Sequence, residues 1–184
     1  FRRVLFRSRW WRQVDRWQPA NLVLIEEVHD LLAARIPPQT VGIVHGDYRP
    51  GNMAFGSDGT VRAVFDWELA TTGDPLVDLS WVACTWREPG DDAAAVLPGP
   101  TGLPGFPSRA EVVERYAQLS GRDVSELPYH IAFSRWRIAC TLAGVYARYQ
   151  GGHMGDDGYA DEVESVVEQS HVLLESALRD LREL

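Results

Sequence analysis

The chain has 184 residues, of which 45% are hydrophobic and 24% are charged, and it carries a net charge of −8 with an isoelectric point near 5.1. This length is enough for one sizeable core, or for one large lobe of a bigger protein. The acidic balance argues against non-specific binding to nucleic acid and against a basic patch for a membrane surface. No apolar run approaches the length of a membrane span, and no signal peptide is recognisable.

Residue types that are absent or sparse exclude further classes of mechanism. The chain contains no lysine, and all 18 of its basic residues are arginines. A mechanism that needs a lysine of this chain, such as a P-loop lysine or a Schiff base, is therefore excluded, and neither GxxxxGK[ST] nor GxGxxG is present. Cys84 and Cys140 lie far apart in apolar runs without CxxC spacing, so we expect two buried thiols in a reducing cytoplasm.

The N-terminal part of the chain divides into three segments. Residues 1–8, FRRVLFRS, are basic and lack a clear period, so we interpret them as a candidate non-native segment and exclude them from the fold. The alternative is the cut end of a native element, and both interpretations place the natural N-terminus upstream. Residues 9–17 form a short amphipathic segment. Residues 21–35 carry a helical apolar stripe that Pro37 and Pro38 end.

A strand, a loop and a hairpin follow the first helices. Residues 41–44 form a short apolar run that is typical of a buried strand. Residues 53–55 and 61–65, with the turn Ser57-Asp58-Gly59 between them, predict a β-hairpin. The segment between the strand and the hairpin reads HGDYRPGN and is broken by glycine and proline.

The rest of the chain is predicted to be helical. A loop rich in Gly, Pro and Asp interrupts it at residues 88–108, and a glycine-rich linker does so at residues 151–158. The coarse order is helix, helix, strand, hairpin and four helices, which predicts an α+β fold that is mostly helical with a small sheet at one edge. The four expected C-terminal helices span residues 76–85, 109–120, 127–149 and 161–184.

Three polar residues of the loop and hairpin are candidates for a metal-dependent site. Asp47 and Asn52 are five residues apart on the loop, and Asp66 ends the second strand of the hairpin. Because a hairpin returns the chain to where it began, we expect Asp66 to lie near Asn52. Two carboxylates and an amide oxygen suit Mg²⁺ better than zinc.

The spacing of these residues matches a known phosphotransfer pattern. In protein kinases, H-R-D-x-x-x-x-N supplies a catalytic Asp and a metal-binding Asn, and a second Asp holds the bridging ions. Here His45-Gly46-Asp47 and Asn52 keep that spacing. We therefore expect Asp47 to orient and deprotonate a substrate hydroxyl, while Asn52 and Asp66 hold Mg²⁺ on the nucleotide phosphates.

The sequence around the motif resembles that of one family. VHGDYRPGNMAF and AVFDWELATTGDPLVDLSW, within residues 41–82, are similar to the aminoglycoside phosphotransferase and choline kinase-like family. They are most similar to the phosphotransferase domains found alongside acyl-CoA dehydrogenases. The flanking helices extend the resemblance over residues 9–184, as a kinase-like C-terminal catalytic lobe.

This resemblance implies a protein kinase-like fold with ATP or GTP bound between two lobes. It implies that His45 supports the catalytic loop rather than attacking a substrate, and that Asp78 packs beneath the loop and hydrogen-bonds it. Asp74 is expected to cap the following helix on either interpretation, because Asp before Pro is a favourable helix start.

The chain also departs from the family pattern. The family's N-terminal lobe carries a five-stranded sheet, a loop that covers ATP and a lysine that pairs with phosphates, and none of these is present. We therefore expect an isolated C-terminal lobe that lacks its N-terminal lobe and is inactive, or nearly so, by itself. Its expected partners are a nucleotide and a small hydroxylated acceptor.

Alternatives remain open for residues near the motif. Arg49 could reach a phosphate or the substrate, or could be a surface arginine. Glu68 could lie near the metal, or could be an exposed or salt-bridged carboxylate. Trp67, Trp81 and Trp86 are expected to be core aromatics.

Alternatives also remain for the function. The acceptor could be an aminoglycoside, as the acidic chain suggests, or a hydroxylated acyl or other metabolic substrate, which the dehydrogenase-associated wording favours slightly. One rival function is a metal-dependent phosphoester hydrolase that uses His45, Asp47 and Asp66. The other is a non-catalytic kinase-like binding fragment, which would be expected to have lost its metal-binding residues.

Overall fold

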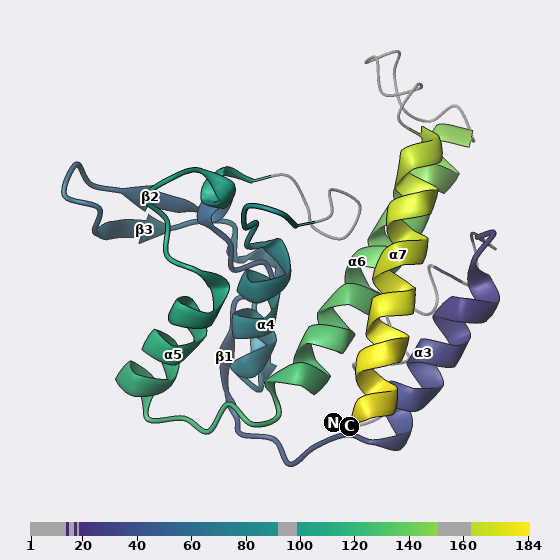
Figure 1. The fold of residues 1–184 in the computed structure, drawn as a ribbon, viewed down its shortest axis with the longest axis horizontal. Coiled ribbons are helices and arrows are strands. Elements are labelled where there is room, and N and C mark those ends of the chain that lie inside the picture. The colour runs from purple at the N-terminus through teal and green to yellow at the C-terminus, as the bar shows by residue number, and fades with distance from the viewer. Residues whose placement is uncertain (1–13, 15–16, 18, 92–98, 151–162) are drawn as a thin grey trace. The chain divides into compact units, whose positions relative to one another are not determined.

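The computed structural model describes residues 14, 17, 19–91, 99–150 and 163–184. Within it the chain divides into two compact units, one formed by residues 37–131 and the other by residues 1–36 and 132–184. The first unit holds all the strands found among the described residues (Figure 1).

Two small antiparallel sheets carry the loop of the 37–131 unit. Strand β1 (Gly42–Val44) pairs with β4 (Thr71–Gly73), with Gly42 opposite Gly73. Strands β2 (Met53–Phe55) and β3 (Val61–Val64) form the predicted hairpin, whose register shifts between Ala54 and Phe55. The sequence predicted one small sheet and did not predict β4, whose three residues include no large apolar side chain.

Helices cover the remainder of this unit. Helix α4 (Leu76–Thr85) and helix α5 (Arg109–Ser120) match their predicted bounds, and α6 (Leu127–Gln150) contributes its first residues. Short 3₁₀ turns lie at Pro50–Asn52, Trp67–Leu69 and Pro100–Gly102. The core is formed by Leu76, Leu79 and Leu127, against which Val113, Tyr116, Val124 and Ile131 pack.

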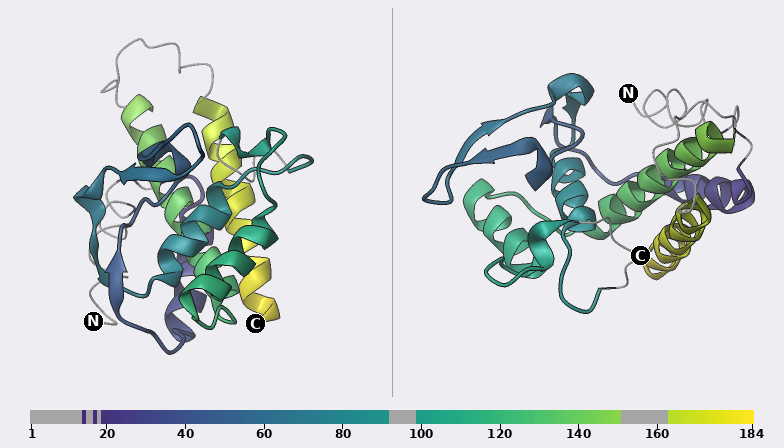
Figure 2. Two further views of the ribbon diagram at one scale, coloured as in Figure 1. Left: turned by 90° about the vertical axis from the view of Figure 1, so that its left-hand side faces the viewer. Right: turned by 90° about the horizontal axis from the view of Figure 1, so that it is seen from above.

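The described part of the other unit is mostly helical. Helix α3 (Leu22–Ala34), the remainder of α6 and helix α7 (Val163–Glu183) lie side by side (Figure 1 and the right-hand view of Figure 2). Trp136 is fully buried and its indole nitrogen donates a hydrogen bond to the carbonyl of Ile25 at 3.0 Å. Burial of such apolar residues is the main term that stabilises the unit. Its other fully buried apolar residues include Val28, Leu32, Ala139 and Leu174.

The predicted fold class is confirmed, since the described residues are mostly helical with a small antiparallel β part. Cys84 and Cys140 are buried free thiols, as expected. Most of the segment 9–17, all of residues 1–8 and the linker 151–158 lie outside the described residues. In the part that is described, no helix combines the length and apolarity that a membrane crossing requires.

Candidate active site

The loop after β1 is shaped by a close backbone approach at Gly46. This residue has φ +88°, and a Cβ atom added there would lie 2.8 Å from the carbonyl oxygen of Leu69. A side chain would therefore meet both a disfavoured backbone conformation and a rigid neighbour. The glycine of the HGD motif lets the loop pack directly on the chain that follows the hairpin.

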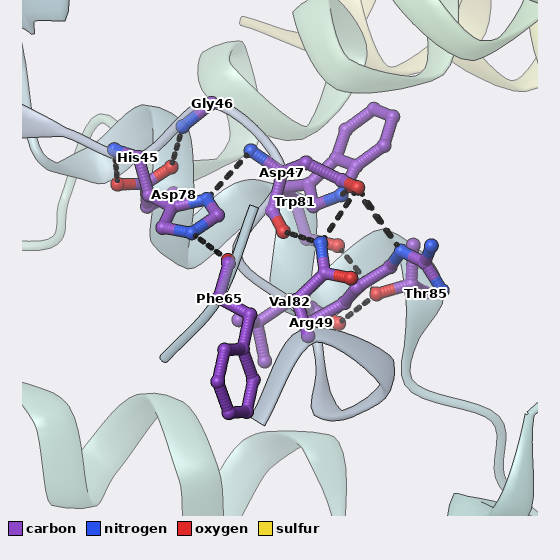
Figure 3. Close-up of polar contacts among 10 residues, drawn as sticks. His45, Gly46, Asp47, Arg49, Phe65, Asp78, Trp81, Val82 and Thr85 are labelled. Atoms are coloured by element: carbon purple, nitrogen blue, oxygen red, sulfur yellow. Dashed lines mark hydrogen bonds and ion pairs between the residues drawn. The ribbon is translucent and has the colours of Figure 1, made fainter. Parts of the chain in front are cut away.

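Asp78 holds the backbone of this loop from helix α4. Its two carboxylate oxygens accept hydrogen bonds from the backbone amides of His45 at 2.6 Å and Gly46 at 2.9 Å (Figure 3). Bonds from amides to a charged acceptor are among the stronger ones in proteins. The first turn of α4 thereby fixes the direction in which the chain enters the loop.

Asp74 stabilises the start of the same helix. Its carboxylate accepts from the backbone amides of Leu76 at 2.9 Å and Thr40 at 2.8 Å, and it is buried. The residue at the cap position itself is Pro75, whose side chain makes no capping bond. Asp74 thus satisfies one free amide of the helix start and joins it to the segment that leads into β1.

The ring of His45 uses both of its nitrogens within the fold. Nδ1 accepts from the backbone amide of Asp47 at 3.2 Å, and Nε2 lies 2.8 Å from the carbonyl oxygen of Phe65 (Figure 3). Because Nδ1 accepts, the proton is carried by Nε2, which donates to the carbonyl. The buried ring, which also contacts the ring of Trp67, thus connects the loop to the end of the hairpin.

The carboxylate of Asp47 receives hydrogen bonds from three side chains (Figure 3). Trp81 Nε1 donates to Oδ1 at 2.6 Å, and Asn52 Nδ2 donates to Oδ2 at 2.8 Å and also to the Asp47 carbonyl. Arg49 Nε lies 3.3 Å from Oδ1 and 3.2 Å from Oδ2. The Asp47 side chain is 18% exposed, so its carboxylate is largely fixed but still accessible.

Asp66 lies at the end of the hairpin in an unusual conformation. It directly follows Phe65, whose amide donates to the carbonyl of Asn52 at 2.8 Å, so the chain does return to the loop. Asp66 has φ 64° and ψ 55°, and it is the only non-glycine residue with positive φ among those described. Left-handed backbone at such a residue is uncommon and often found at functional sites.

The remaining candidate residues differ in their surroundings. Arg49 is exposed and ion-paired with Asp47, while Glu68 is exposed on the 3₁₀ turn at Trp67–Leu69. Trp81, expected as a core aromatic ahead of a substrate stacker, is buried but also bonds the candidate catalytic carboxylate. Nothing in its apolar helical spacing could have revealed that bond. The same expectation of a core aromatic is wrong for Trp67, which is 51% exposed.

The fold is of the kinase-like phosphotransferase class. The chain belongs to the phosphotransferase enzyme family, whose model matches residues 2–126.

The chain is also similar to curated proteins and to a solved structure. The chain is 31% identical to "Probable acyl-CoA dehydrogenase IBR3" of Arabidopsis thaliana, over 91% of the chain and 23% of that protein. It is 31% identical to acyl-CoA dehydrogenase family member 11 of Gallus gallus, over 79% of the chain and 20% of that protein. The chain therefore spans less than a quarter of these relatives.

One structural relative is a crystal structure from Ralstonia eutropha, described as that of "a putative aminoglycoside phosphotransferase". It matches with a TM-score of 0.75 and 28% identity, over 95% of this chain and 54% of the other. The likeness therefore covers nearly all of this chain and about half of its relative.

Proposed function

We propose that this chain carries the catalytic loop of a Mg²⁺-dependent phosphotransferase that moves the γ-phosphoryl group of ATP or GTP to a hydroxyl of a small molecule. The main observation that supports this proposal is the environment of Asp47. Its carboxylate is fixed by neighbouring donors, lies at the surface of the loop and is bonded to Asn52, the second polar residue of the motif. Catalysis of phosphoryl transfer depends mainly on such positioning and on charge stabilisation.

The residues fit the magnesium that this proposal requires. Within the described part of the chain, the side-chain oxygen of Asn52 accepts no hydrogen bond, and the carboxylate of Asp66 has neither a hydrogen bond nor an ion pair. Both are hard oxygen donors that remain available for a cation. Bound there, Mg²⁺ would neutralise charge that develops on the transferred phosphoryl group.

The protein residues would divide the remaining work. Asp47 would accept the proton of the acceptor hydroxyl and orient its oxygen towards phosphorus. His45 would not take part directly, because both of its ring nitrogens are engaged in the fold. Arg49 is the donor placed to leave Asp47 for a phosphate, since its side chain is 45% exposed.

The class of acceptor is inferred from the names of the relatives. The structural relative is described as an aminoglycoside phosphotransferase, and the curated relatives are acyl-CoA dehydrogenases by name. We propose a hydroxylated acyl or related metabolic substrate ahead of an aminoglycoside, because the chain is 31% identical to curated relatives that are named acyl-CoA dehydrogenases.

The rival functions have less support. A hydrolase with a transition metal would need a cluster of His, Cys, Asp or Glu ligands, and none with three or more members occurs among the described residues. His45 could ligate a metal only by breaking one of its two ring bonds. A degenerate binding fragment would be expected to have lost Asp47, Asn52 or Asp66, and all three are present.

Calorimetry of nucleotide binding to the 184-residue chain tests the proposal. We expect ATP to bind only with Mg²⁺, and Asp66→Asn to abolish this binding. Asp58→Asn is the matched control, because Asp58 is an aspartate of the hairpin turn that pairs with Arg62 away from the site. Binding that is equal with and without Mg²⁺, or that persists in Asp66→Asn, would contradict the proposed metal site.

A further inference from the structure

The side chain of Asp47 is held by donors of two different kinds. A carboxylate has about four lone-pair positions, and here the three donors occupy both oxygens. Arg49 reaches both oxygens from an exposed position, at 3.2 and 3.3 Å. Trp81 and Asn52 are buried, and their bonds are shorter, at 2.6 and 2.8 Å. Arg49 is therefore the exchangeable donor, and the other two are fixed.

Trp81 differs from Asn52 because it does not belong to the loop. It lies on helix α4, three residues after Asp78, so the two side chains share one face of the helix. Asp78 binds the loop backbone at His45 and Gly46, while Trp81 binds the side chain of the next residue (Figure 3). One helical face thus fixes both the main chain and the carboxylate.

The geometry of the indole suits a positioning role. Trp81 is 8% exposed, so its ring is held by packing and the N–H direction is set by the helix. The indole N–H can only donate and bears no charge. It can therefore orient Asp47 Oδ1 without carrying the positive charge by which Arg49 would attract phosphate.

We propose that Trp81 is a positioning residue for Asp47, whose indole N–H fixes Oδ1 so that the carboxylate keeps its direction when Arg49 leaves. This inference rests on the proposed function, because it assigns Asp47 the role of proton acceptor. After Arg49 departs, each oxygen retains one donor and regains a free lone pair for the acceptor hydroxyl. The alternative is that Trp81 has only a packing role in the core.

The kinetic test uses the protein in its natural form. Trp81→Phe keeps an aromatic ring but removes the N–H donor. We expect kcat to fall about tenfold to a hundredfold, with KM for nucleotide and acceptor nearly unchanged, since misplaced catalytic groups affect turnover. A purely packing role predicts no selective fall in kcat, and a kcat within about twofold of wild type would overturn the proposal.

Trp86→Phe is the matched control. Trp86 follows the last residue of α4, and its indole donates to the carbonyl of Pro107 at 2.9 Å, away from the loop. This variant loses the same chemical group and one similar hydrogen bond, so its kcat is expected to stay near the wild-type value. If Trp81→Phe fails to fold, the benzothienyl analogue of tryptophan at position 81 preserves the ring shape and still removes the N–H.

A second readout separates this inference from the proposed function. In the 184-residue chain, the indole N–H signal of Trp81 is identified by nuclear magnetic resonance from its loss in Trp81→Phe. Asp47→Asn is expected to move that signal upfield, because an amide oxygen is a weaker acceptor than a carboxylate, and to leave the Trp86 signal in place. An unmoved Trp81 signal would refute the bond. If the wild-type protein transfers no phosphoryl group, the proposed function fails and this signal alone decides whether Trp81 fixes the carboxylate.

Discussion

At the scale of single residues, the backbone of Asp66 leads to a prediction about stability. Its φ of 64° lies in the left-handed region, which costs most residues about 1–2 kcal/mol but costs glycine little. Asp66→Gly should therefore be more stable than Asp66→Ala by about 1 kcal/mol. Urea unfolding of both variants measures the difference.

The control for this prediction is the neighbouring 3₁₀ turn. Glu68 lies in ordinary helical backbone, so Glu68→Ala should be at least as stable as Glu68→Gly, the opposite order to that at Asp66. The same order at both positions would show that Asp66 is not held in the left-handed conformation.

The second residue-scale prediction concerns Asp47. In the natural form of the protein, Asp47→Asn should lower kcat by about a hundredfold to ten-thousandfold, because the proposed general base is lost. KM for ATP should change little, since Asn52 and Asp66, the proposed metal ligands, are kept. Steady-state kinetics with the acceptor under study measures both constants. Unchanged turnover would refute the assigned role.

The sequence singled out the motif residues because their spacing is typical of phosphotransfer sites. The structure joins Asp47 and Asn52 by a hydrogen bond, and the catalytic and metal-binding roles stay predictions. Asp47, Asn52 and Asp66 belong to a recognisable phosphotransfer pattern, and the hairpin implied that its end would return to the loop. The bond from Trp81 to Asp47 could not be predicted. An aromatic residue at helical spacing gives the same sequence pattern whether its N–H donates to a carboxylate or its ring only packs in the core. Three-dimensional contacts between α4 and the loop decide that role.

At the scale of elements, helix α4 supports the loop through Asp78. Asp78→Ala would leave the amides of His45 and Gly46 without acceptors, and we expect the free energy of unfolding to fall by about 2–4 kcal/mol. Asp78→Asn keeps one acceptor oxygen and should cost less. Urea unfolding measures both, with Asp30→Ala as a control because that side chain is 82% exposed. Equal stabilities of all three variants would contradict the support role.

Helix α5 provides a prediction about pH. The carboxylate of Glu111 accepts hydrogen bonds from the backbone amide and from the hydroxyl of Ser108. Both bonds lower the pKa of Glu111 below its ordinary value of 4.5, and the bond from the amide has the larger effect. A lowered pKa in the folded state means that the stabilisation is present above pH 4.5 and is lost as pH falls through the folded-state pKa.

The pH dependence of unfolding by urea tests this capping box. Glu111→Gln should remove part of the loss of stability below pH 4.5, and Ser108→Ala should lower stability by about 1 kcal/mol near neutral pH. Glu114→Gln is the control, because Glu114 lies on the same helix outside the box. A Glu111→Gln variant with the wild-type acid dependence would contradict the prediction.

The elements also show where sequence reasoning reached its limit. Helices α4 and α5 were predictable to their ends, because an apolar period runs between Asp-Pro or Ser at the start and a loop or Gly at the end. Strand β4 was missed, because Thr71, Thr72 and Gly73 show no apolar alternation. Its pairing with β1 depends on backbone hydrogen bonds between distant segments, which local pattern does not encode.

At the scale of the whole molecule, charge composition gives the last prediction. The 184 residues include no lysine, so a lysine that pairs with nucleotide phosphates cannot come from this chain. The chain also spans only 54% of its structural relative and 23% of its Arabidopsis relative. We therefore expect the 184-residue chain to transfer phosphoryl groups at less than about one hundredth of the rate of a phosphotransferase of its family that has both lobes, because lost charge stabilisation of this kind costs at least that factor.

The measurement compares release of labelled phosphoryl product from ATP by both proteins, at equal concentration and with the same acceptor. Mg²⁺-dependent ATP binding by the isolated chain, measured in parallel, separates a correctly folded half-site from a misfolded fragment. Binding without turnover would show that the proposed metal ligands bind Mg²⁺ and ATP even when the rest of the active site is missing. Turnover by the isolated chain at the rate of the phosphotransferase with both lobes would mean instead that arginines of this chain, beginning with Arg49, stabilise the phosphates without any lysine.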